Sequence, residues 1–491
     1  MGTGAVGSML ESFIESLRVR DLPAFLRDGL IGEGLPLTGP FGARPLLYAD
    51  YVASGRALRQ VEDFILDKVL PYYANSHTEA SYCGAFCTRL REEARRAIAR
   101  IVGAGEGTSV VFAGSGATAG LNKIVGLLDI PGAIARGEKV AVFIGPYEHH
   151  SNILPWRESG ALLVEIPESE AGGPDLAALE AALIDHAGAD LRVGAFSAAS
   201  NVTGILADSE AVTRLLKRYG ALAVWDYAGG APYLPMSMDS GSDAAKDAIV
   251  FSPHKFPGGP GATGVLVIRE SVIRVNRPTA PGGGSVTFVS PWGHAYSGRV
   301  SAREEAGTPN VVGDIRAALV LLIKQALGQD FIDSRDAALR ERALTVWRDS
   351  PRLELLGRFD VPRLPIFSFR VRDGAGGYVH HQLFTRLLSD LFGIQARGGC
   401  ACAGPYAHRL LDIDRDRSDA IFAAIDAGVE MERPGWVRLN FSYLMSDENA
   451  DRVIAAVDEL ARNAGDYIGE YVFDPRTARF RHKDELQGLE G

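Results

Sequence analysis

The 491-residue sequence has few cysteines and no long hydrophobic run, and both shortages exclude classes of protein. Four cysteines are too few for a disulfide framework, which favours a reducing, cytoplasmic setting. No segment approaches the roughly 20 consecutive apolar residues of a membrane-spanning helix, and early acidic residues argue against a secretory signal. Basic blocks are missing too, and the net charge is −10. Neither nucleic acid nor a membrane is therefore an expected partner.

What is present is a regular alternation of apolar runs and helical patterns. Hydrophobic residues make up 46% of the chain and charged residues 23%, as in a globular protein with more than one domain. Nearly continuous apolar strands between helices predict an α/β fold with a mainly parallel sheet covered on both faces. Ligands of such sheets bind where strands end. The predicted strands are 109–114, 139–145, 161–167, 193–200, 221–228, 248–252 and 264–269.

Changes in composition along the chain predict four parts. We expect a large α/β domain over 45–313 and a smaller α+β domain over 314–470, with strands at "PIFSFRV" and "WVRLNFS". An N-terminal segment, 1–44, is expected to pack on the small domain. The last part, 471–491, reads as a charged tail.

The stretch "AIVFSPHKFPGGPGATG", residues 248–264, places Lys255 at the end of a predicted buried strand, directly before a loop of glycine and proline. Lysines normally lie on solvated faces, where the charge stays hydrated. A lysine at a strand end in an α/β sheet is therefore a candidate for covalent chemistry through its amine.

Three other predicted strand ends carry polar groups. "FAGSGATAG" (112–120) has the small residues of an anion-binding turn, with Thr118 as a further donor, although tight turns often look the same. "GPYEHHSN" (145–152) has two histidines, which are often core residues, and no metal-ligand spacing accompanies them. Asp226 ends "AVWD", where a buried acid needs a cationic partner. Together an anion cradle, a flat histidine, a buried aspartate and a lysine suit pyridoxal phosphate.

These motifs, in this order, resemble the class V, fold-type I pyridoxal-phosphate enzymes from about residue 46 to 460. The cysteine desulfurase and selenocysteine lyase branch is the most similar. The resemblance implies a fold-type I structure and a homodimer with shared active sites. It implies that the cofactor contacts Gly116, Ala117, Thr118, His149, Asn201, Asp226, Ala228, Ser252, His254, Lys255 and, from a partner subunit, Thr308. It implies substrate contacts from Asn75, His77, Arg397 and Arg438, and catalysis by Lys255, His149 and Cys402.

The cysteine of this branch is expected in "IQARGGCACAGPY", residues 394–406. Counted from Arg397, Cys402 falls on the position of the cysteine that takes up sulfur from the substrate. Cys400 is a second candidate, and the pair could also exchange as a dithiol or hold a metal with outside ligands. A buried structural cysteine is the alternative for Cys402, and a structural role is the expectation for Cys83 and Cys87.

Three features depart from the family pattern. Gly229 stands where a glutamine is usual, and 399–401 replace the usual histidines before the cysteine. The chain is also longer, at both ends and around 271–300. The expected activity is conversion of L-cysteine to L-alanine, with sulfur passed to an enzyme cysteine; an acceptor protein is the candidate recipient of that sulfur. A carbon–sulfur lyase, an epimerase or an aminotransferase would use the same scaffold. A nucleotide-binding domain without chemistry would leave Lys255, Asp226, His149 and Arg438 unexplained together.

Overall fold

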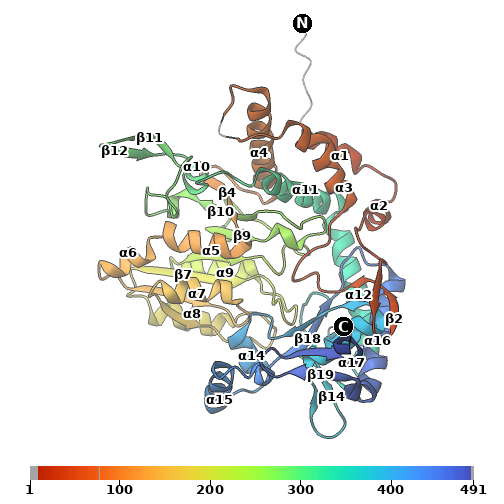
Figure 1. Cartoon of the computed structure of the whole chain (residues 1–491). Helices are drawn as coiled ribbons and strands as arrows, with labels where there is room; N and C mark the ends of the chain where they lie inside the picture. Colours follow the sequence, from red (N-terminus) through yellow and green to blue (C-terminus); the bar gives the residue numbers. More distant parts are fainter. Residues whose placement is uncertain (1–8, 77, 488–491) are drawn as a thin grey trace. The chain divides into compact units, whose positions relative to one another are not determined.

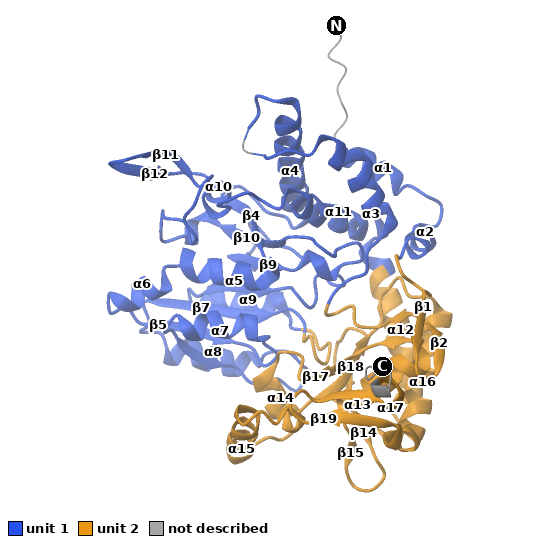
Figure 2. Cartoon of the chain, viewed as in Figure 1, with its two compact units in different colours: residues 1–30, 54–199, 207–331 blue, residues 31–53, 200–206, 332–491 orange. Residues whose placement is uncertain are grey.

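The computed structural model describes residues 9–76 and 78–487, and the chain divides into two units (Figures 1 and 2). Unit 1 comprises the described residues up to Leu30 with Ser54–Ala199 and Ala207–Phe331. Unit 2 comprises Ile31–Ala53, Ser200–Leu206 and the described residues from Ile332 onward. Within the described part of the chain, no helix is both long and apolar enough to cross a membrane.

Unit 1 is built on a seven-stranded sheet, which confirms the predicted α/β class. Five neighbouring strands, β9-β8-β7-β5-β6, run parallel, and β10 is antiparallel to both β9 and β4. The strands β5 and β9, each with a neighbour on both sides in the sheet, are buried at every residue, as their uninterrupted apolar sequences require. In sheet order the strands are β4 (Thr108–Gly114), β10 (Gly264–Arg269), β9 (Ala248–Phe251), β8 (Leu222–Asp226), β7 (Leu191–Ser197), β5 (Val140–Ile144) and β6 (Leu162–Glu165).

Helices connect the strands of this sheet and cover it. The helix α5 (Gly116–Leu127) packs over β4, β9 and β10 through Leu121 and Ile124, which are fully buried. The helix α9 (Ser209–Arg218) begins at Asp208, whose carboxylate accepts the Ala211 N–H, and packs on β8. The other helices of unit 1 are α1 (Met9–Ser16), α2 (Leu22–Asp28), α3 (Arg59–Phe64), α4 (Tyr82–Ile101), α6 (Ile130–Ala135), α7 (Leu154–Glu158), α8 (Leu176–Asp185), α10 (Val300–Glu304) and α11 (Val311–Leu327).

Unit 2 has an antiparallel sheet of order β13-β14-β18-β17, with β15 paired to β14. The predicted strands "PIFSFRV" and "WVRLNFS" correspond to β14 (Ile366–Arg372) and β18 (Trp436–Asn440). Trp347 lies in the core, 5.1 Å from Phe367 between ring centroids. The remaining elements are β1 (Pro36–Gly39), β2 (Gly42–Pro45), β3 (Leu47–Tyr48), α12 (Gln329–Trp347), β13 (Leu353–Leu355), β15 (Tyr378–Val379), α13 (His381–Phe392), β16 (Ile394–Gln395), β17 (Arg397–Gly399), α14 (Gly404–Leu410), α15 (Arg415–Asp426), α16 (Asp447–Tyr467), β19 (Tyr471–Asp474), β20 (Arg479–His482) and α17 (Lys483–Gln487).

The division into units differs from the predicted boundaries, and residues 45–53 and 200–206, expected in the large domain, belong to unit 2. The helix α1 belongs to unit 1 instead of the small domain, because the Phe13 ring packs on Phe64 at 5.2 Å. Unit 1 also keeps α11, which packs along α4 and is joined to it by an Arg91–Asp314 ion pair of 2.6 Å. The expected tail forms the β19–β20 hairpin, and the Tyr471 hydroxyl donates to the Asp390 carboxylate of α13.

The extra sequence around 271–300 contains a two-stranded hairpin, β11 (Val286–Ser290) and β12 (Gly293–Tyr296). Figure 1 shows it extending away from the sheet of unit 1. Three large apolar side chains on it are exposed, and Trp292 at its tip is 92% exposed. The other two are Phe288 and Val289. Such a patch is typical of an interaction surface.

Candidate functional site

Asp226 and Lys255 are brought together in unit 1 at the carboxyl ends of neighbouring strands. Asp226 is the last residue of β8, and Lys255 ends the short 3₁₀ turn Pro253–Lys255 that follows β9. The carboxylate of Asp226 is buried and accepts the Ala228 N–H at 2.7 Å. Burial raises the pKa of Asp226, while this hydrogen bond and the Lys255 charge act in the opposite direction. A buried acid of this kind favours a cationic partner.

The N-terminus of α5 forms a cradle of small residues beside the same turn. The Ala117 N–H donates to Ser252 Oγ at 2.9 Å. Gly116 has a φ of +63°, and a Cβ there would lie 3.0 Å from Ser252 Oγ and 3.1 Å from His254 Cε1. A Cβ at Gly264 would lie 2.3 Å from the Gly116 carbonyl oxygen. Gly264 therefore has no room for a Cβ, the positive φ and close neighbours of Gly116 favour glycine there too, and the helix N-terminus stays open to an anion.

Histidine and hydroxyl groups surround this cradle. Thr118 Oγ1 lies 2.6 Å from Ser151 Oγ, which lies 3.0 Å from His149 Nδ1. Because the Ser151 N–H donates to His149 Nδ1 at 3.1 Å, the neutral ring carries its proton on Nε2. Burial, with the Lys255 charge, lowers the pKa of His254 to about 4, so that imidazole is neutral at pH 7.

Glu148 is a buried carboxyl that the sequence analysis missed. Its Oε1 accepts N–H groups from Ser197, the last residue of β7, at 2.8 Å and from Gly145, just after β5, at 3.2 Å. Its Oε2 accepts from Ser197 Oγ and Asn152 Nδ2, each at 2.6 Å. Burial outweighs these donors and raises the pKa of Glu148 to about 7. The residue ties two strand ends to the segment that carries His149. The sequence did offer a sign of this residue, because Glu148 is an acid in "GPYEHHSN", the segment that follows an apolar strand.

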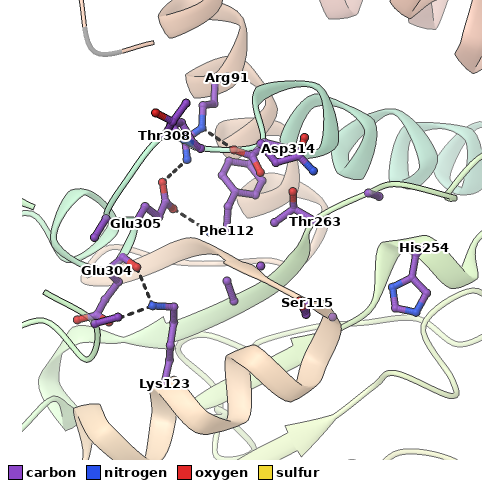
Figure 3. A pocket seen from close by; sticks show the side chains of 18 of the residues that line it. Arg91, Phe112, Ser115, Lys123, His254, Thr263, Glu304, Glu305, Thr308 and Asp314 are labelled. Atoms are coloured by element: carbon purple, nitrogen blue, oxygen red, sulfur yellow. Dashed lines mark hydrogen bonds and ion pairs between the residues drawn. The ribbon is translucent and has the colours of Figure 1, made fainter. Parts of the chain in front are cut away.

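A cavity of about 730 Å³ in unit 1 reaches this cradle (Figure 3). Gly116 and His254 line the cavity beside the N-terminus of α5. Thr308, in the loop before α11, lines it as well. Thr308 thus shares a cavity with the N-terminus of α5 in its own chain. The predicted contact of Thr308 with a partner subunit's phosphate stays a prediction.

The cations that line this cavity are paired with acids. Arg91 pairs with Asp314 at 2.6 Å and also with Glu305, and Lys123 Nζ lies 3.5 Å from the Glu304 carboxylate (Figure 3). The Lys123 ammonium also donates to the Glu304 carbonyl oxygen at 2.7 Å. These pairs join α4, α5 and α11 to the segment before Thr308, and so they fix the wall of the cavity.

In unit 2 two predicted substrate-binding arginines share one carboxylate. Arg438 donates to Asp50 Oδ1 at 3.0 Å and to the Asn201 carbonyl oxygen at 3.0 Å, and only 3% of its side chain is exposed. Arg397 donates to Asp50 Oδ2 at 3.0 Å, but 49% of its side chain is exposed. Burial lowers the pKa of Arg438, and Asp50 opposes this effect. Arg397 is therefore the more accessible cation for an anionic substrate.

The loop with Cys400 and Cys402 also lies in unit 2, directly after β17. Cys402 is exposed and Cys400 is half-buried. Asn201 Nδ2 donates to the Ala401 carbonyl oxygen at 2.9 Å, so the predicted cofactor residue Asn201 is held by this loop and Arg438. Its Oδ1 is buried without a hydrogen-bond partner among the described residues.

The predicted residues therefore fall into two groups, one in each unit. Unit 1 brings together the cofactor residues around Lys255 and Asp226, and unit 2 brings together Asn201, Arg438 and the cysteine loop. Asn75 is exposed in the loop before α4, and His77 lies outside the described residues. The roles assigned to these residues toward a cofactor or a substrate stay predictions.

Comparisons with known proteins identify the family of the chain. Residues 47–453 match the family model described as Aminotransferase class-V. A probable cysteine desulfurase of Vibrio cholerae is 30% identical over 417 residues, which are 84% of this chain and 93% of the relative. The apo structure of a cysteine desulfurase from Thermococcus onnurineus has a TM-score of 0.70 at 25% identity, covering 85% of this chain and 95% of that one. A cysteine desulfurase structure from Escherichia coli shares the fold, with a TM-score of 0.67 at 22% identity over 91% of this chain and 100% of that one.

Proposed function

The chain belongs to the aminotransferase class V family of pyridoxal-phosphate enzymes, and from that premise we propose that it is a cysteine desulfurase. It would convert L-cysteine to L-alanine and retain the sulfur on a protein thiol. The observation that carries this proposal is the position of Lys255 and the buried Asp226 at the ends of neighbouring strands, beside the N-terminus of α5, with the Lys255 charge acting on the Asp226 carboxyl. Similarity to cysteine desulfurases over most of the chain supports the choice of substrate.

The residues of unit 1 fit the cofactor. The N-terminus of α5 at Gly116 to Thr118, with Ser252 and the neutral His254, would hold its phosphate. Asp226 would pair with its ring nitrogen, Ala228 would lie under the ring, and His149 would stack over it. When bound, pyridoxal phosphate supplies an electron sink for the α-carbon of an amino acid.

Lys255 would hold the cofactor aldehyde through its amine and then act as the base. The free amine of Lys255 would then remove the α-proton of the amino-acid substrate. Asp226, buried and held by the Ala228 N–H, would stabilise positive charge at the ring nitrogen. With its Nε2 proton, His149 is able to donate toward the substrate.

Cys402 would accept the sulfur. Its thiolate would attack the sulfur of the substrate cysteine, forming an S–S bond; the C–S bond would break with its electron pair on carbon, and protonation of that carbon would give alanine. Exposure of Cys402 suits both this attack and later transfer to an acceptor protein. Arg397, half-exposed, would bind the substrate carboxylate together with Arg438. Asn75 and His77 are proposed to lie near the substrate.

We place this enzyme in the cytoplasm as a homodimer with shared active sites. Thr308 of one subunit would contact the phosphate bound by the other. The exposed hairpin with Trp292 offers an apolar surface for such an assembly.

The test is to load the purified protein with pyridoxal phosphate, supply L-cysteine, and measure alanine by amino-acid analysis. We expect alanine from the wild type and from Cys83→Ser, a matched control whose thiol lies on α4 in unit 1. Cys402→Ser should lose alanine formation while the cofactor remains bound. A cofactor-loaded wild type that forms no alanine would contradict the proposal and direct the search to lyase, epimerase or aminotransferase activity.

A further inference from the structure

Cys400 and Cys402 lie on one tight turn. The Ala403 N–H donates to the Cys400 carbonyl oxygen at 3.3 Å, which closes a four-residue turn over 400–403. Both central residues, Ala401 and Cys402, have a φ of +55°, the pattern of a type I′ turn. Glycine, asparagine or aspartate normally occupies these positions, and here neither residue is one of them. Left-handed conformations of other residues persist only where the surroundings impose them, and they cluster at functional sites.

The surroundings of this turn hold it in place. Asn201 Nδ2 donates to the Ala401 carbonyl oxygen at 2.9 Å, and Ala403, fully buried, starts the chain toward α14. Each thiol also lies within electrostatic range of an arginine. The pKa of Arg433 is raised chiefly by Glu430 and in smaller part by Cys400. Burial lowers the pKa of Arg438, and Cys402 is among the groups that oppose it. Both sulfurs are therefore near cationic groups that can stabilise sulfur anions.

The turn also sets the spacing of the two cysteines. One residue, Ala401, lies between the two cysteines. The path from one cysteine Cα to the other therefore consists of two Cα–Cα steps of ~3.8 Å each. Folding of the chain at the turn brings that separation into the range of ~4.4–6.8 Å that a disulfide accepts. Neither thiol is fully buried, so both are open to attack and to exchange.

We propose that Cys400 is a resolving thiol, which attacks the sulfur-loaded Cys402 and releases the sulfur as sulfide. This inference rests on the proposed desulfurase function and adds a fate for the sulfur. The thiolate of Cys400 attacks the Cys402 sulfur; the Cys400–Cys402 bond forms and the bond to the outer sulfur breaks. Hydrosulfide leaves with the electron pair and is protonated by solvent. The outer sulfur is reduced by two electrons, and the two cysteine thiols are oxidised to a disulfide.

The next turnover then requires a reductant. A dithiol protein or a small thiol returns two electrons to the Cys400–Cys402 disulfide and restores both thiols. An acceptor protein would compete with Cys400 for the outer sulfur. The chain would then deliver sulfur to an acceptor when one is present and release sulfide when none is.

The experiment is one turnover of the cofactor-loaded protein with L-cysteine and without any reductant. Alanine, sulfide and the intact mass of the protein are measured in the same sample. The wild type should release one sulfide per alanine, and its peptide 397–409 should carry an internal disulfide, lighter by two hydrogen masses. Cys400→Ser should retain one extra sulfur mass on Cys402, and its sulfide per alanine should fall at least about tenfold, because the neighbouring thiol is at high effective concentration only in the wild type.

Cys83→Ser is the matched control, and its sulfide per alanine should equal that of the wild type. If the wild type forms alanine but keeps an extra sulfur and no disulfide, the resolving role is refuted and the desulfurase function stands. Equal sulfide release by Cys400→Ser would refute it as well. Absence of alanine from the wild type would refute the desulfurase function, and the resolving step with it. A second experiment tests, without turnover, whether Cys400 and Cys402 can form a disulfide. The reduced protein is treated with oxidised glutathione, and the peptide that contains both cysteines is analysed by mass. A peptide without an internal disulfide would also overturn the proposal.

Discussion

Asp50 should contribute far more to stability through Arg438 than through Arg397, although both distances to Asp50 are 3.0 Å. Asp50→Asn keeps an amide oxygen as an acceptor but removes the carboxylate charge that pairs with the buried guanidinium of Arg438. Breaking a buried pair from one side costs about 3–5 kcal/mol. Removal of Arg397, whose side chain is 49% exposed, should cost about 0.2–1 kcal/mol.

Calorimetric unfolding of the two variants separates these contributions. At roughly 2–4 °C per kcal/mol for a unit of this size, Asp50→Asn should lower Tm by about 6–20 °C. Arg397→Ala is the matched control and should lower it by less than about 4 °C. Added salt should reduce the Arg397 effect and leave the Asp50 effect nearly unchanged. Equal shifts in the two variants, or a stabilised Asp50→Asn, would refute the argument from burial.

Three further outcomes are expected. Lys255→Ala should keep the fold but lose the visible absorbance of the cofactor-loaded protein and all turnover, and a coloured, active variant would contradict the assignment. Asp226→Asn should fold and lower kcat by about 10²-fold or more, because charge stabilisation in the reacting complex is lost; a steady-state assay that finds an unchanged kcat would exclude that role. Glu148 binds its proton up to about pH 7 when folded but only to about 4.5 when unfolded, so the folded state holds more protons between these values. The free energy of unfolding should therefore fall by about 3 kcal/mol as pH rises through that window. Urea unfolding at several pH values should show this slope in the wild type and not in Glu148→Gln.

The strand-end residues were predictable because they follow from local patterns. Lys255 and Asp226 end apolar runs, and the topology of a parallel sheet brings the carboxyl ends of such runs to one edge. Gly116 lies in the turn of small residues that the sequence singled out, whereas the need for glycine at 264 appears only in the fold, where a Cβ would meet the Gly116 backbone.

Contacts between distant segments were not predictable from the sequence. Asp50 and Arg438 are 388 positions apart, and no periodicity links them. Glu148 was passed over because its partners lie at the ends of two different strands, which only the folded sheet brings together. The place of α1 in unit 1 likewise depends on the contact of Phe13 with Phe64, which hydrophobic spacing alone does not specify.

The hairpin β11–β12 also gives this protein a natural optical reporter. The chain has five tryptophans, and Trp292 is 92% exposed, whereas the other four are fully buried. Those four are Trp156, Trp225, Trp347 and Trp436. An aqueous quencher such as iodide should therefore reach the indole at the hairpin tip and leave the rest of the emission almost intact. The quenchable fraction of the fluorescence then reports, without any label, whether another surface covers the hairpin.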